Sequence, residues 1–136
     1  MLDDLGIDII EAGWPGSNPK DSEFYRLARE IKLSHSRLAA FGSTRRVDVR
    51  VEDDLTMNSI LKSEVPVAVI FGKAWTLHVR EVLRCTEEEN KKIIEDSISY
   101  LKDHGLEVIF DAEHFFDGWK ESSSYALDVL KTAYES

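Results

Sequence analysis

The sequence has little cysteine and no long apolar segment. Its single cysteine, Cys85, cannot form a disulfide within the chain, which is typical of proteins from a reducing compartment, so we expect a cytoplasmic location. The longest apolar run, Val65 to Phe71, is far too short to cross a bilayer. Met1 is followed by Leu2 and two aspartates rather than by the basic opening of a secretory signal. These absences predict a protein without a membrane partner.

The sequence also lacks an excess of positive charge. It contains 26 acidic and 17 basic residues, which gives a net charge of −9, and no basic run is longer than two residues. Such a surface repels phosphate backbones, so we expect no nucleic-acid partner. The sequence contains neither a Walker sequence nor a dinucleotide-binding glycine fingerprint. It therefore gives little support to nucleotide binding through these motifs.

Four short apolar runs indicate an α/β protein. They cover residues 6–13, 37–42, 65–72 and 106–113, and they alternate with segments of helical periodicity. This alternation is typical of βαβ units and a parallel sheet. Because the sequence has the length of one domain and contains no linker, we expect one domain over residues 1–136 and no second domain.

The segments between these runs carry their own helix signals. The predicted helices cover residues 21–32, 52–62, 86–104 and about 122–136. The first follows Asn18 and Pro19, a cap and a first-turn proline. The third has the strongest signals, because Thr86 and Glu89 have capping-box spacing and Gly105 supplies a stop. Residues 1–6 resemble the last turn of a further helix with its glycine stop. Four consecutive strand–helix units that begin and end with a helix segment predict a slice of a larger barrel.

Acidic residues stand where two of the predicted strands end. Glu11 closes the first run, and Asp111 and Glu113 close the last. Active sites of β/α proteins lie at the carboxyl ends of the strands, and strand alternation places Asp111 and Glu113 on one face. If these faces point into a barrel, the acids converge at its mouth. The alternatives are that Glu11 pairs with an Arg or Lys of a neighbouring strand, or that the strands end one residue early and the acids are solvated.

Two further loops are candidates for binding. Arg45 follows the second run beside hydroxyl residues and another arginine, as in a loop that holds a carboxylate or phosphate, although an ordinary solvated loop fits equally well. Lys73, Trp75 and His78 follow the third run. They could line a substrate mouth, or they could belong to a short extra helix. Cys85 has no histidine nearby in the sequence, so we expect it to be buried and inert.

Four segments closely resemble the citramalate synthases. They are EAGWPGSNPKD at 11–21, AFGSTRR at 40–46, IFGKAWTLHV at 70–79 and FDAEHFFDG at 110–118. Citramalate synthases belong to a metal-dependent TIM-barrel family with 2-isopropylmalate synthase, homocitrate synthase and hydroxymethylglutaryl-CoA lyase. The resemblance extends over nearly the whole chain, with the segments in the family's order and spacing.

The resemblance implies a partial (β/α)8 TIM barrel of about four consecutive βα units, strands 2 to 5, of a pyruvate-carboxyltransferase-like catalytic barrel. Such enzymes are acyltransferases, and citramalate synthase condenses acetyl-CoA with pyruvate in isoleucine biosynthesis. By position, Glu113 matches the catalytic glutamate of the family. Glu11, Asp111, His78 and Arg45 are the expected substrate-binding residues.

The resemblance also implies a divalent metal, Mg²⁺, Mn²⁺ or Zn²⁺, in the full-length enzyme. The family's metal ligands are an aspartate on the first strand and a His-x-His pair on the seventh, and the sequence contains no His-x-His. His114 beside Glu113 lacks the spaced ligand pairs of a metal site. We therefore expect this chain alone to hold no metal and to be inactive, and we expect the full-length enzyme to be a homodimer.

Two alternatives remain open at this point. The chain could be part of a 2-isopropylmalate or homocitrate synthase, because the choice of oxo acid depends on pocket residues that lie partly outside it. It could instead be an α/β module that binds a small anion through Arg45, Arg46 and Lys73 without catalysis.

Overall fold

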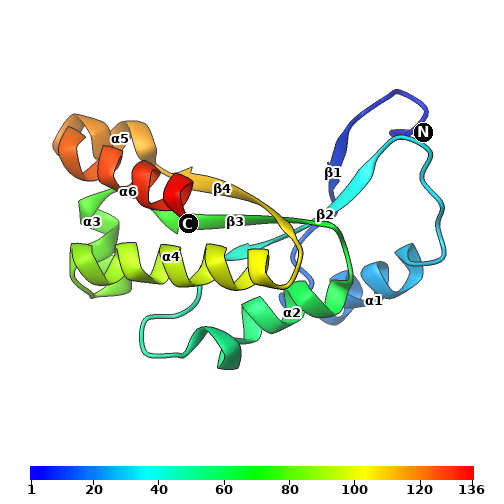
Figure 1. The fold of residues 1–136 in the computed structure, drawn as a ribbon, viewed down its shortest axis with the longest axis horizontal. Helices are drawn as coiled ribbons and strands as arrows, with labels where there is room; N and C mark the ends of the chain where they lie inside the picture. The colour runs from blue at the N-terminus through cyan, green and yellow to red at the C-terminus, as the bar shows by residue number, and fades with distance from the viewer.

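The computed structural model describes residues 1–136 as a four-stranded sheet with helices packed against it (Figure 1). The strands are β1 (Ile9–Glu11), β2 (Arg37–Ser43), β3 (Val67–Lys73) and β4 (Glu107–Glu113). The helices are α1 (Pro19–Ala28), α2 (Leu55–Ser63), α3 (Thr76–His78), α4 (Glu87–Asp103), α5 (Phe115–Glu121) and α6 (Ser123–Glu135), with a 3₁₀ turn at Val51–Asp53 and a π-helical turn at Val79–Leu83. None of the helices combines the length and the apolar character needed to span a bilayer.

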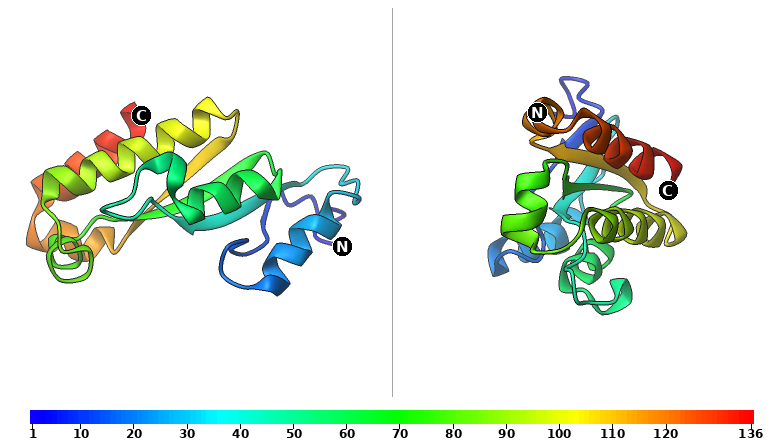
Figure 2. Two further views of the ribbon diagram at one scale, coloured as in Figure 1. Left: turned by 90° about the horizontal axis from the view of Figure 1, so that it is seen from below. Right: turned by 90° about the vertical axis from the view of Figure 1, so that its left-hand side faces the viewer.

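The sheet has the topology of consecutive βα units. Its strands are all parallel and lie in the order β1-β2-β3-β4, so each strand pairs with the next along the chain. In the end-on view of Figure 2, α1, α2, α4 and α6 follow one another around the outside of the curled sheet. These features confirm the predicted α/β class and agree with part of a TIM barrel.

The helix starts follow the local signals in the sequence. At α1, the Asn18 side chain accepts a hydrogen bond from the Asp21 N–H at 3.0 Å. At α4, the Thr86 hydroxyl oxygen accepts from the Glu89 N–H at 3.1 Å, as the capping box predicts. Gly105 has a φ of 85°, a left-handed conformation that ends α4 without a side-chain clash. α1 is shorter than predicted and ends at Ala28.

The start of α2 depends on a buried aspartate. Asp54 is fully buried, and its Oδ1 accepts from the backbone N–H groups of Thr56 at 2.8 Å and Met57 at 3.2 Å. Its Oδ2 accepts from the backbone N–H of Arg46 at 3.1 Å and from the Arg46 Nε at 3.2 Å. One carboxylate therefore caps α2 and fixes the loop that follows β2.

The helices bury one face of the sheet. Ala40, Ala68 and Ile70 are fully buried strand residues, and Gly42 shares their face. A Cβ on Gly42 would lie 2.8 Å from the Thr56 methyl carbon, so only glycine allows α2 to approach this closely. The α-helix residues of the same core cluster are Tyr25, Met57, Ile60, Ile94, Ile98, Leu101, Tyr125 and Val129.

The first residues form a single turn that is tied to the loop before β2. The Asp3 carboxylate accepts hydrogen bonds from the backbone N–H groups of Ser34 and His35, both at 2.8 Å, and of Ser36 at 2.6 Å. The Ser36 N–H and the other donors stabilise the charged form, so they hold the pKa of Asp3 far below its usual value. Gly6 follows with a φ of 75°, as a helix-stop glycine would.

Candidate active site

Strand register determines where the predicted acids lie. Through β2 and β3, Glu11 is in register with Glu107 at the start of β4, whereas Glu113 is in register with Lys73. Side chains alternate between the two faces along a strand, and positions 107 and 113 are an even number of residues apart, so Glu107 and Glu113 share a face. Glu11 is in register with Glu107 and therefore lies on the same face, opposite the helices. The two carboxylates share this face but lie at different levels along it, so they are not side by side. Glu11 and Asp111 are exposed to solvent.

Glu113 forms an ion pair with Lys73 at the carboxyl ends of β3 and β4. The Lys73 side chain is only 15% exposed and the Glu113 side chain 32%. The Lys73 ammonium also lies 5.1 Å from the centre of the Phe71 ring, within range of a cation–π interaction. An ion pair between neighbouring strands, which the sequence offered as an alternative for Glu11, is therefore found at Glu113 instead.

A buried asparagine anchors the main chain of Lys73. The Asn90 side chain on α4 is fully buried, and its Nδ2 donates to the Lys73 carbonyl oxygen at 2.8 Å and to the Tyr125 hydroxyl at 2.7 Å. Burial raises the pKa of Tyr125 to about 12, so the hydroxyl stays neutral over the physiological range. These contacts join α4, α6 and the end of β3 at one point.

Two histidines and a tryptophan meet beside this ion pair. His78 of α3 and His114, which follows β4, have ring centres 4.7 Å apart, and the Trp75 ring lies 4.9 Å from His78 and 5.9 Å from His114. His114 adopts a left-handed backbone with a φ of 56° as the chain turns from β4 into α5, and its Nδ1 lies 3.2 Å from Asp117 Oδ2. The His78 Nδ1 is buried and has no hydrogen-bond partner.

The segment after β3 is both a short helix and a wall of this site. It forms α3 and the π-helical turn, which confirms the short extra helix, while a role in lining a substrate mouth stays a prediction. The indole N–H of Trp75 donates to the Glu121 carboxylate of α5, which also accepts from Arg80 at 3.0 Å. The hydrogen bond from Trp75 is the main cause of the lowered pKa of Glu121.

Sequence reasoning did not predict α5 or the aromatic residues on the open face. α5 packs closely against the end of β3, because Gly118 lies directly over the Ala74 carbonyl. Trp14, Phe41 and Phe71 form an aromatic cluster, with ring centres separated by 6.2 Å between the first two, 6.0 Å between Trp14 and Phe71, and 5.6 Å between the two phenylalanines. Positions 41 and 71 alternate with the helix-facing residues, so strand periodicity could have identified this cluster.

Arg45 is not at the mouth with the other predicted residues. Its guanidinium is ion-paired with Asp96 of α4 at 2.8 Å, and its Nη1 donates to the carbonyl oxygens of Arg46, Val47 and Val49 at 3.0 to 3.2 Å. The side chain is 10% exposed. This guanidinium therefore holds the loop after β2 against α4, and its contact with substrate stays a prediction.

The side chains of this chain do not form a metal site by themselves. No group of three or more His, Cys, Asp or Glu side chains has the arrangement to hold a metal ion, and Glu113 is already paired with Lys73. Cys85 is partly buried, and burial raises the pKa of its thiol, which leaves it a poor ligand and nucleophile.

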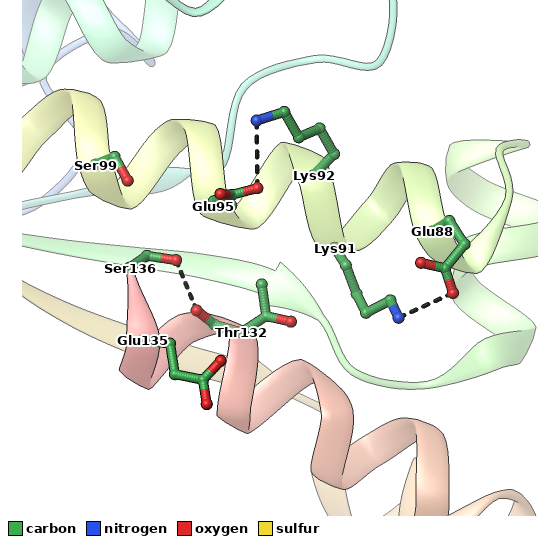
Figure 3. Close-up of a pocket in the computed structure, with 8 residues that line it drawn as sticks. All are labelled: Glu88, Lys91, Lys92, Glu95, Ser99, Thr132, Glu135 and Ser136. Carbon is green, nitrogen blue, oxygen red and sulfur yellow. Dashed lines mark hydrogen bonds and ion pairs between the residues drawn. The ribbon is translucent and has the colours of Figure 1, made fainter.

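A separate cavity of about 490 Å³ lies between α4 and α6, away from the acids at the strand ends (Figure 3). Its lining is entirely polar, and both of its lysines are paired within α4, Lys91 with Glu88 at 2.9 Å and Lys92 with Glu95 at 3.2 Å. We therefore place the candidate active site at the ion pair and the histidines, and not in this cavity.

Comparison with known proteins gives no match to a family model. The chain is, however, 54% identical over all of its 136 residues to an (R)-citramalate synthase of Sulfolobus acidocaldarius, of which it covers 26%. It is 51% identical over 97% of its length to an (R)-citramalate synthase of Aquifex aeolicus, of which it covers 25%. A homocitrate synthase of Saccharolobus islandicus is 32% identical over 99% of the chain, which covers 28% of that protein. The chain thus spans about a quarter of the length of these relatives, and over its whole length it is similar to a segment of citramalate synthases.

Proposed function

We propose that the chain supplies strands 2 to 5 of the catalytic barrel of a citramalate synthase, a cytoplasmic acyltransferase of branched-chain amino-acid biosynthesis. The reaction is a Claisen-type condensation of acetyl-CoA with pyruvate, and the working enzyme is a homodimer. The observation that carries the proposal is the 54% identity over the whole chain to a citramalate synthase, against 32% to a homocitrate synthase.

The chemistry requires a base and a way to stabilise negative charge. A methyl proton must leave the weakly acidic thioester, and a carboxylate at the carboxyl end of a barrel strand is suited to receive it. Glu113 has this position, and its partner Lys73 is the cation beside it. We therefore assign the catalytic role to Glu113, with His78 and the exposed Asp111 lining the substrate mouth and Glu11 lower on the same face.

A divalent cation would stabilise the charge that develops on the ketone oxygen, as a Lewis acid. Because the side chains described above do not form a metal site, we place its ligands in the rest of the enzyme. The residues of this chain would then act around that cation by orienting the oxo acid and by receiving the thioester proton.

The anion-binding module is the weaker alternative, because each of its three cations is already paired with a carboxylate. Arg45 is paired with Asp96 at 2.8 Å, Arg46 with the buried Asp54 at 3.2 Å, and Lys73 with Glu113. An incoming anion would have to displace a carboxylate at each position, which costs more than binding to a free cation.

A domain exchange tests the proposed function. This chain would replace the matching quarter of the Sulfolobus acidocaldarius citramalate synthase, and CoA release would be measured with pyruvate, 2-oxoisovalerate and 2-oxoglutarate offered separately. We expect a folded chimera that prefers pyruvate by about tenfold or more.

Preference for 2-oxoisovalerate or 2-oxoglutarate would instead favour 2-isopropylmalate or homocitrate synthase. A folded chimera that releases no CoA with any of the three acids would contradict the proposal. A chimera that cannot fold would contradict the placement of the chain in the barrel. The unmodified relative, prepared in parallel, is the control for the assay.

A further inference from the structure

Lys73 is held by more contacts than a solvent-facing lysine at a strand end. Its carbonyl oxygen accepts a hydrogen bond from the buried Asn90 amide at 2.8 Å, and its ammonium lies over the Phe71 ring. The ammonium is ion-paired with Glu113 on the neighbouring strand, and no other acceptor contacts it. The main chain and the side chain of Lys73 are therefore both fixed, and its one carboxylate partner is the proposed catalytic group.

This ion pair is not required to hold β3 and β4 together. The two strands are in register over seven consecutive residue pairs, from Val67 with Glu107 to Lys73 with Glu113. Beyond the pair, the Ala74 N–H donates to the Glu113 carbonyl at 3.3 Å and continues the pairing of the strands. A mostly buried ion pair is also an inefficient way to gain stability, because two apolar side chains of similar size would serve as well or better.

We propose that Lys73 is a positioning residue, which acts through Glu113 by fixing the orientation of its carboxylate. This inference depends on the catalytic role of Glu113 in the proposed function. A glutamate side chain has three rotatable bonds, and the ion pair selects one arrangement of them on the open face of the sheet. The rate of proton transfer depends steeply on such geometry, and a displacement of about 1 Å can cost roughly 100-fold.

The test is a double-mutant cycle in the catalytically competent chimera. The variants are Lys73→Met, Glu113→Gln and the combination of both, and kcat and the KM of each substrate are measured for all three. We expect Lys73→Met to lower kcat about tenfold or more, with both KM values within about twofold of the parent. In the Glu113→Gln background, adding Lys73→Met should have little further effect, because the group through which Lys73 acts is already removed.

Two results would overturn the inference. If the two substitutions multiply in their effects on kcat, Lys73 acts independently of Glu113. If Lys73→Met raises the KM of pyruvate and spares kcat, Lys73 contacts the substrate carboxylate directly and is not a positioning residue. The cycle is repeated with Lys73→Gln, which keeps N–H donors, so that a failure of the apolar variant to fold does not decide the outcome.

A matched control and a separate readout distinguish this inference from the proposed function. Arg37→Met removes a cation from the same face, where Arg37 pairs with Glu107 at the opposite end of the strands, and it should leave kcat unchanged. Parent-like turnover of Glu113→Gln alone would refute the catalytic role of Glu113. Failure of the Lys73 cycle, with Glu113→Gln still inactive, would refute only the positioning role.

Discussion

Gly118 in the middle of α5 provides a sharp test of how the site is assembled. Glycine is the least favourable ordinary residue in a helix interior, so Gly118→Ala should stabilise α5 by about 1 kcal/mol on propensity alone. The structure predicts the opposite sign. A Cβ at this position would lie 2.2 Å from the Ala74 carbonyl oxygen and 3.0 Å from the Trp75 Cα, and both are main-chain atoms that cannot rotate away.

The magnitude follows from comparing the two effects. To accept the methyl group, α5 must recede by about 1 Å, because non-bonded heavy atoms are stable only beyond roughly 3.5 Å. Overpacking of this kind costs about 1–3 kcal/mol, which exceeds the gain in propensity. We therefore expect Gly118→Ala to lower the free energy of unfolding by up to about 2 kcal/mol. The same movement would separate His114 from His78, whose rings are now 4.7 Å apart.

Urea unfolding of the 136-residue chain, followed by circular dichroism, measures the free energy of unfolding. Chemical shifts of the two imidazole rings report the movement of α5. Lys120→Ala, an exposed substitution on the same helix, is the matched control and should change stability by less than about 0.5 kcal/mol. A Gly118→Ala chain as stable as the parent, with unchanged imidazole shifts, would refute the close approach of α5 to the end of β3.

Three further predictions concern other parts of the chain. Asp54→Ala should lower the free energy of unfolding by about 2–4 kcal/mol, because it removes the α2 cap and leaves the part-buried Arg46 N–H unpaired. Asp53→Ala, at an exposed neighbour, should cost under about 0.5 kcal/mol in the same urea assay. The pKa of Asp3 is lower in the folded chain than its unfolded value of about 3.9, so its stabilisation is complete above that pH and is lost below it. Asp3→Asn should therefore destabilise the chain at pH 7, and the difference from the parent should shrink as the pH falls below about 4 in acid-unfolding curves; a constant difference would contradict the role of Asp3. Calorimetric titration of the chain alone with Mg²⁺, Mn²⁺ or Zn²⁺ should show no tight stoichiometric binding, and a tight site would contradict the placement of the metal ligands outside these residues.

Local signals in the sequence were sufficient for most of the fold. The four apolar runs became the four strands, and α4 began at Thr86 and ended before Gly105, because caps and glycine stops act within one turn of the chain. The helix α5 was missed because Gly118 and the short length of the segment give no periodic signal, and contacts with the end of β3 stabilise it instead.

The candidate site was predictable only in part, because its geometry depends on contacts between distant segments. The sequence named Glu113 and His78 as candidates, since acids and histidines after apolar runs mark the carboxyl ends of strands, and the structure places both there. It could not assign Arg45, whose partner Asp96 lies 51 positions away along the chain. Nor could it predict how far Glu11 lies from Glu113 along the strand direction. Alternation shows which face of the sheet a side chain is on, whereas its position along the strands depends on the register between them.

The sequence by itself determined the α/β class and the order of the elements, because these depend on periodicity and on capping residues. Its similarity to citramalate synthases is likewise a property of the sequence alone. The tertiary structure alone decided that Lys73 is paired with Glu113 and that Arg45 is committed to α4. The physical reason is that a charged side chain is stabilised by the partner that it meets in space, and helix packing against the sheet selects that partner.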